Sequence, residues 1–182
     1  MDSTWPCEWG SPLAGDARDR YLTLALVPGI GAARLRALLA TFQTADGALA
    51  APFELLRTVP GMSAAAATAV RETSRDVGAR ARIATEQLGG QVLCPGDPGF
   101  PDGLVEIAEP PTALFLLGRL DCLARQAVAI VGSRDHSGYG AAVTAALARG
   151  AAAAGLVVVS GMARGLDAVA HTATLEAPRE RP

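Results

Sequence analysis

The sequence contains no lysine and no asparagine, and all 16 of its basic residues are arginine. Aromatic residues make up only 4% of the 182 residues, and the formal net charge is −2 at pH 7. A chain with so little net charge does not attract nucleic acid through its overall field, so such binding must come from a local patch. Arginine suits a patch of this kind, because its planar guanidinium group can hold a phosphate through two hydrogen bonds.

Cysteine is also scarce, and long apolar runs are missing. Cys7, Cys94 and Cys122 are odd in number and widely spaced, which argues against a disulfide framework and against a zinc site. The first residues lack a basic segment followed by an apolar one, so no signal peptide is expected. The small apolar stretch Ala141–Met162 is broken by Arg149 and several glycines and is not a membrane span. We therefore expect a cytoplasmic protein without metal ion, cofactor or membrane association.

Half of the residues are apolar, enough to bury a core, and the stretch Ala127–His171 organises the chain. Ala127–Val131 and Leu156–Val159 are short apolar runs typical of parallel strands that are covered on both faces. A helix is expected between them, from about Gly140 to Ala154, with Gly155 as its left-handed C-cap. Two parallel strands joined by a helix form the opening unit of a doubly wound α/β sheet.

Each predicted strand is followed by a loop with the composition of a phosphate site. Both loops lie at the carboxyl edge of the predicted sheet, where open α/β folds bind their ligands. Small residues leave backbone N–H groups accessible to an anion, and each loop adds a hydroxyl group, an arginine and the start of a helix. The predicted phosphate-binding residues are Gly132, Ser133, Arg134, Ser137, Tyr139, Ser160, Gly161, Met162, Ala163, Arg164 and Gly165. No catalytic residue is predicted.

Simpler roles for these residues stay open. The glycines and serines could only form tight turns, and the two arginines could pair with Asp135 or Asp167. The serines could cap the following helices instead of donating to phosphate. Tyr139 could stack on a base or pack under its loop. Asp167 is expected to cap the last helix and to orient Arg164, and it shares a helix face with His171 in what we interpret as a structural pair.

Upstream, the sequence is helical and contains an internal repeat. Val27-Pro28-Gly29-Ile30-Gly31 returns as Val59-Pro60-Gly61-Met62-Ser63, each between helical segments, which is the pattern of a helix-hairpin-helix pair. The second copy is expected to lead into one long alanine-rich helix that stops at Gly89. Such loops either expose N–H groups to a DNA phosphate or only join packed helices, and only Arg34 and Arg36 accompany the first loop.

Three short motifs lie between the repeat and the first phosphate loop. They are Phe100-Pro101-Asp102-Gly103-Leu104, Pro110-Pro111 and Leu114-Phe115-Leu116-Leu117-Gly118. Together with GSRxxSxYG and VVSGMARGLDAVAH, they closely resemble the DNA-processing protein A family (DprA, also called Smf) from about Tyr21 to Ala177. By this resemblance, strands at Gln91–Cys94 and Ala113–Leu117 are expected to extend a Rossmann-like sheet.

The expected organisation is a tail at residues 1–19, a small all-α helix-hairpin-helix or SAM-like domain at 20–89, and a Rossmann-like domain at 90–182. Its doubly wound, mainly parallel sheet should be incomplete, because the chain looks C-terminally truncated. The resemblance implies a protein that is not an enzyme, binds single-stranded DNA through its phosphates and helps to load a RecA-type recombinase in natural transformation. It also implies that full-length members self-associate as homodimers.

The alternative is an enzyme that binds nucleotides. Phosphoribohydrolases of the lysine-decarboxylase-like group have a related fold and a Gly-Ser loop after the first strand, but their PGG-x-GT-x-x-E segment is absent here. A dinucleotide-dependent enzyme fits less well, because the loop after Val131 reads GSRDHSGYG and not GxGxxG. Binding of oligo-dT, AMP or NAD would distinguish these classes.

Overall fold

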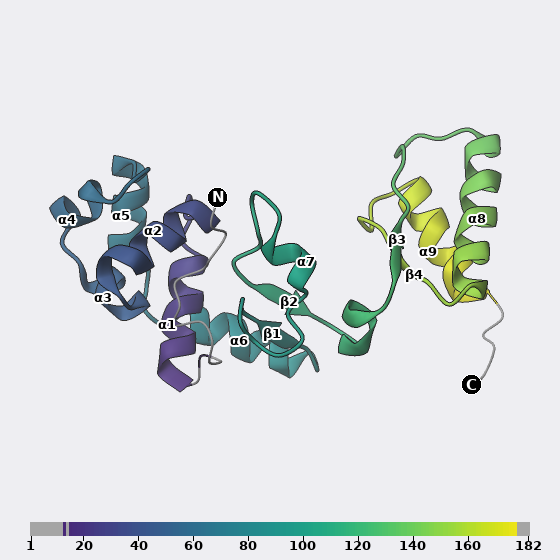
Figure 1. Ribbon diagram of the computed structural model, residues 1–182. Helices are drawn as coiled ribbons and strands as arrows, with labels where there is room; N and C mark the ends of the chain where they lie inside the picture. The colour runs from purple at the N-terminus through teal and green to yellow at the C-terminus, as the bar shows by residue number, and fades with distance from the viewer. Residues whose placement is uncertain (1–12, 14, 178–182) are drawn as a thin grey trace. The chain divides into compact units, whose positions relative to one another are not determined.

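The computed structural model describes residues 13 and 15–177, a mixed α/β chain with an N-terminal helical region and small sheets (Figure 1). By its internal contacts the chain divides into two compact units, one ending at Leu123 and the other beginning at Ala124. The first unit contains α1 (Gly15–Ala25), α2 (Ala32–Phe42), α3 (Ala45–Ala50), α4 (Phe53–Thr58), α5 (Ala64–Glu72), α6 (Val77–Gln87), β1 (Gln91–Leu93), α7 (Asp102–Val105) and β2 (Leu114–Leu116). The 3₁₀ helix η2 (Leu120–Ala124) crosses the division. Helix α1 begins inside the expected tail, of which residues 1–12 and 14 lie outside the described part.

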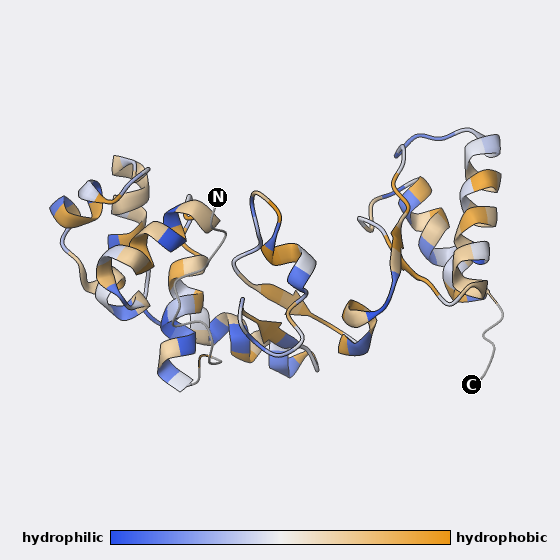
Figure 2. Ribbon diagram, in the orientation of Figure 1, coloured by the Kyte–Doolittle hydropathy of each residue, from blue (hydrophilic) through white to orange (hydrophobic). Residues whose placement is uncertain are grey.

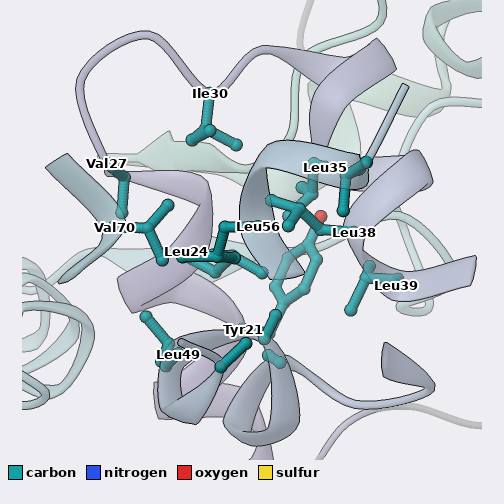
Figure 3. Close-up of a cluster of buried hydrophobic side chains, with 14 of the residues drawn as sticks. Tyr21, Leu24, Val27, Ile30, Leu35, Leu38, Leu39, Leu49, Leu56 and Val70 are labelled. Atoms are coloured by element: carbon teal, nitrogen blue, oxygen red, sulfur yellow. The ribbon is translucent and has the colours of Figure 1, made fainter. Parts of the chain in front are cut away.

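A hydrophobic core holds the helical region together (Figure 3). Leu35, Leu38 and Leu39 recur at helical spacing on α2, so this helix turns one apolar face inward, as the sequence predicts. Tyr21 and Leu24 from α1 pack into the same cluster and are at most 1% exposed. Full burial of a large apolar side chain contributes about 1.5–3 kcal/mol, so this cluster is the main source of stability in the first unit.

The repeated pentapeptide forms the same turn twice. Gly29 and Gly61 have φ values of +83° and +76°, the left-handed conformation that the third residue of a type II turn requires. In both copies the N–H of the fourth residue donates to the carbonyl of the first at 3.0 Å. A helix precedes and follows each turn, as expected for a pair of helical hairpins.

The single long helix expected after the second turn is wrong, because α5 and α6 are separated by a break at residues 73–76. The break lets α6 pack closely on α1. A Cβ atom on Gly78 would lie 2.1 Å from the Asp19 carbonyl oxygen and 2.5 Å from the Thr23 nitrogen. The Gly78 N–H also donates to the Thr23 hydroxyl at 2.9 Å. This long-range contact acts together with the low helix propensity of Thr73, Ser74 and Asp76 in the break.

β1 and β2 pair antiparallel as a separate two-stranded sheet, so the expectation that they extend the parallel sheet is wrong. Polar contacts attach this region to α1 instead. Arg18 forms a 2.7 Å ion pair with Asp97, and the Tyr21 hydroxyl donates to the Thr112 carbonyl at 2.7 Å. By internal contacts, both strands therefore belong with the helices to the first unit.

The second unit contains β3 (Ala127–Ala129), α8 (Gly138–Ala153), β4 (Val157–Val159) and α9 (Leu166–Glu176). β3 and β4 pair in parallel, as predicted from their apolar composition. Helices α8 and α9 pack against each other and against β4 (Figure 1). Gly155, two residues after α8, has a φ of +75° and the left-handed conformation expected for it.

Within the described part of the second unit, one face of the β3–β4 pair is covered and the other is not, which corrects the expectation that both faces are buried. Ile130 and Val158 pack against the helices, whereas Val131 and Val159 are 78% and 51% exposed. Because side chains alternate along a strand, Val159 and its exposed register partner Ala129 lie on the opposite face from Val158. Figure 2 shows apolar colour on these strands and on parts of α8. No element in the described part of this unit packs on that face.

The second unit has a sparse hydrophobic core, whose cluster of buried side chains in the described part consists of Ala148, Ala170 and Ala173. Alanine buries little apolar area, so we expect this unit to be only marginally stable. Limited proteolysis should therefore degrade residues 124–182 first and leave a fragment that ends near Leu123. Equal protection of both units in a monomer would contradict this expectation.

Candidate functional site

The two predicted loops lie together at the carboxyl edge of the β3–β4 pair. The first loop, residues 130–137, follows β3, and the second loop, residues 160–165, follows β4. Because the strands are parallel, both loops leave the same edge of the sheet. The Ser160 hydroxyl donates to the Ile130 carbonyl at 2.7 Å, which ties the start of the second loop to the first.

The loops also approach each other backbone to backbone. The Leu166 N–H donates to the Ser133 carbonyl at 3.1 Å. Gly165 has a φ of +91°, and a Cβ atom there would lie 2.3 Å from the same Ser133 oxygen. A side chain at this position would push the loops apart, so the structure requires glycine here.

Arg134 and Arg164 lie on the first and second loop, and both are exposed. Among the described residues neither arginine forms an ion pair or a side-chain hydrogen bond, so the pairing with Asp135 or Asp167 is not observed. Both guanidinium groups are therefore free to contact an anion, although Asp135 and the buried Asp167 bring two negative charges to the same edge. Guanidinium groups in this setting suit the oxygens of neighbouring phosphates.

Asp167 does not have the expected role of orienting Arg164. Its side chain is buried, and it accepts hydrogen bonds from the N–H groups of Gly132 at 3.3 Å and Ala163 at 3.4 Å. Both N–H groups, predicted to face phosphate, thus donate to the protein's own carboxylate. His171, one turn later, has a buried Nε2 without a hydrogen-bond partner in the described part of the chain. The sequence shows no sign of this bridge, because Gly132 and Asp167 are far apart along the chain.

The serine hydroxyls are engaged in local structure. Ser137 Oγ accepts from the Gly140 N–H at 3.1 Å and caps α8, as the alternative interpretation held. Ser133 Oγ accepts from the Asp135 N–H at 3.1 Å and donates to the carbonyl of the same residue. Ser133 and Ser160 therefore shape and join the loops and do not cap helices.

Two apolar side chains are exposed at the site. Tyr139, in the first turn of α8, is 80% exposed, so its ring is not packed under the loop. Met162 is 84% exposed and has a φ of +54°, an uncommon conformation for a residue with a side chain. Backbone strain of this kind is often found at functional loops, and nothing in the residue type predicts it.

The two Val-Pro-Gly turns of the helical region come together at Arg34. Its Nε donates to the Gly61 carbonyl at 2.7 Å and its Nη1 to the Gly29 carbonyl at 2.6 Å. A pocket of about 480 Å³ between the turns is lined in part by Pro60 and by the acidic residue Glu109. Because Arg34 is used to join the turns and Glu109 repels anions, this arrangement favours a packing role for the hairpins.

The family described as DNA recombination-mediator protein A matches residues 91–180, which include both loops. Protein Smf from Synechocystis sp. is 39% identical over 94 residues, 50% of this chain and 24% of that protein. The chain belongs to the DprA/Smf family. Protein Smf from Escherichia coli is 41% identical over 85 residues, 46% of this chain and 23% of that protein. DNA processing protein DprA from Streptococcus pneumoniae is 42% identical over 80 residues, 44% of this chain and 28% of that protein.

The chain thus spans about a quarter of the length of these DprA/Smf relatives. The X-ray structure of DprA from Streptococcus pneumoniae has a similar fold, with a TM-score of 0.61 and 24% identity over 91% of this chain and 55% of that chain. None of the helices that the structure describes is long and apolar enough to cross a membrane. Within residues 13 and 15–177, no group of three or more His, Cys, Asp or Glu side chains could hold a metal ion.

Proposed function

We propose that this DprA/Smf chain binds single-stranded DNA through its phosphates at the edge where the two loops meet. The observation that carries the proposal is the placement of Arg134 and Arg164, which are exposed on two loops that are bonded to each other. The second unit would then be the opening part of a Rossmann-like doubly wound sheet, with its ligand at the carboxyl edge. No catalytic step is assigned to this site.

The exposed ring of Tyr139 supports a single strand as the ligand, because unpaired bases can stack on an aromatic side chain. Phosphate and stacking contacts carry little sequence information, so binding should tolerate any sequence. Family membership extends the proposal to cytoplasmic DNA processing in natural transformation, with a RecA-type recombinase as partner and homodimers in full-length members. We assign the helical residues 20–89 an accessory role, since Arg34 joins their two turns.

Fluorescence anisotropy with labelled oligo-dT tests the proposed function, with duplex DNA, AMP and NAD as competitors. We expect oligo-dT to bind and its affinity to fall with salt. A plot of the logarithm of the binding constant against the logarithm of the salt concentration should have a slope of about −0.7 per phosphate neutralised. AMP and NAD should compete weakly, because neither offers a run of phosphodiesters. Tight, salt-insensitive binding of AMP or NAD would instead indicate a nucleotide-binding enzyme.

A further inference from the structure

Asp167 is buried between the two loops, whereas Arg134 and Arg164, the two arginines of the proposed phosphate site, are exposed. It is 4% exposed and lies at the second residue of α9. Oδ1 accepts from the N–H of Gly132 in the first loop, and Oδ2 accepts from the N–H of Ala163 in the second. Each carboxylate oxygen therefore holds one loop.

The position of this carboxylate depends on Gly161. A Cβ atom on Gly161 would lie 2.9 Å from Asp167 Oδ2, closer than real Cβ contacts occur. An alanine methyl group at position 161 would therefore require the Asp167 carboxylate to shift, without changing any charge. A Gly161→Ala substitution therefore tests the position of the Asp167 carboxylate while its charge is kept.

We propose that Asp167 is a positioning residue, an internal anion that holds the two loops in register so that Arg134 and Arg164 engage one DNA strand together. The inference rests on the proposed function, because the ligand is the same strand. Asp167 occupies two backbone N–H groups that could otherwise face a phosphate. The arginine side chains, and not these amides, therefore supply the contacts to DNA.

Electrostatics and positioning predict opposite effects for Asp167→Asn. Removal of a negative charge beside a phosphate site would strengthen DNA binding. Asparagine, however, offers one acceptor oxygen and one NH₂ donor, so it can hold only one of the two N–H groups. If positioning dominates, the loops separate and the two arginines no longer bind at once.

The experiment compares Asp167→Asn and Gly161→Ala with Gly150→Ala in salt titrations of oligo-dT binding. Gly150 lies on α8 with no heavy atom near its missing Cβ, so its variant should bind like wild type. We expect the first two variants to lose about tenfold in affinity, as for one lost charged contact. The salt slope should become shallower by about 0.7, because one phosphate fewer is neutralised. Unchanged or tighter binding by folded Asp167→Asn, or an unchanged slope in Gly161→Ala, would overturn the proposal.

Amide hydrogen exchange separates this inference from the proposed function. In wild type the N–H groups of Gly132 and Ala163 should be protected without DNA, and Asp167→Asn should expose at least one of them. Retained protection of both would overturn the positioning role whether or not the chain binds DNA. If Asp167→Asn fails to fold, Gly161→Ala with its intact carboxylate decides by the same readouts. Failure of wild type to bind oligo-dT would overturn the proposed function and the role of Asp167 in DNA binding, whereas the exchange of the two N–H groups would still decide whether Asp167 holds the loops.

Discussion

Alanine at both Arg134 and Arg164 is expected to weaken oligo-dT binding by about a hundredfold, or about tenfold for each arginine. Each guanidinium group is exposed and has no partner in the described part of the protein, so its loss removes a phosphate contact and breaks no internal bond. The loss should be similar for every DNA sequence, since phosphate contacts do not read bases. Anisotropy titrations measure the affinity, and thermal melting should show no change in stability.

Arg149→Ala is the matched control, because it removes the same charge from an exposed position on α8 away from the loops. Its effect on binding should be small. Gly31→Val, at the first Val-Pro-Gly turn, should also leave the affinity nearly intact if the hairpins are packing units. Loss of binding in a folded Gly31→Val protein, with no effect of the two arginine changes, would place the DNA on the helical region instead.

Alanine at Gly78 is expected to lower the free energy of unfolding of the first unit by about 2–4 kcal/mol. The new Cβ atom would lie 2.1 Å from a backbone oxygen of α1, so α6 must move away and lose its bond to the Thr23 hydroxyl. The better helix propensity of alanine returns only about 1 kcal/mol. The melting temperature should fall by roughly 10 °C or more.

Gly103→Ala serves as the control for Gly78→Ala. Gly103 lies in α7 of the same unit, and no heavy atom is within 4 Å of its missing Cβ. Calorimetry or circular dichroism should give this variant a melting temperature equal to that of wild type or slightly higher. A Gly78→Ala protein that melts like Gly103→Ala would contradict the close packing of α6 on α1.

Local patterns predicted the elements that local forces determine. The short apolar strands β3 and β4, the left-handed Gly155 and the two Val-Pro-Gly turns all follow from residue type and spacing. The pairing of β1 with β2 could not be predicted from the sequence, because a strand of three residues does not specify which strand it pairs with. The break between α5 and α6 also depends on a distant contact, that of Gly78 with α1.

For the site, the positions of the loops were predictable and the roles of their residues were only partly so. Arg134 and Arg164 lie on adjoining loops, as parallel strands require. The use of individual backbone N–H groups was not predictable, because it depends on where Asp167 lies in three dimensions. An acidic residue two positions after a glycine, such as Asp167 after Gly165, is a common signal of a helix start. That interpretation did not predict that its carboxylate would accept hydrogen bonds from both loops.

The alanine core of the second unit links ligand occupancy to folding. Alanine has no side-chain rotamers to order, so this unit gains little from burial and loses little side-chain entropy, while it still loses the backbone entropy of folding. A ligand that spans both loops binds the folded form alone, and at a hundred times its dissociation constant it adds about 2.7 kcal/mol. Against a total margin of about 5–15 kcal/mol for an ordinary domain, that is a large share. The bound strand would thus supply a large part of the folding stability that the small side chains of this unit do not provide.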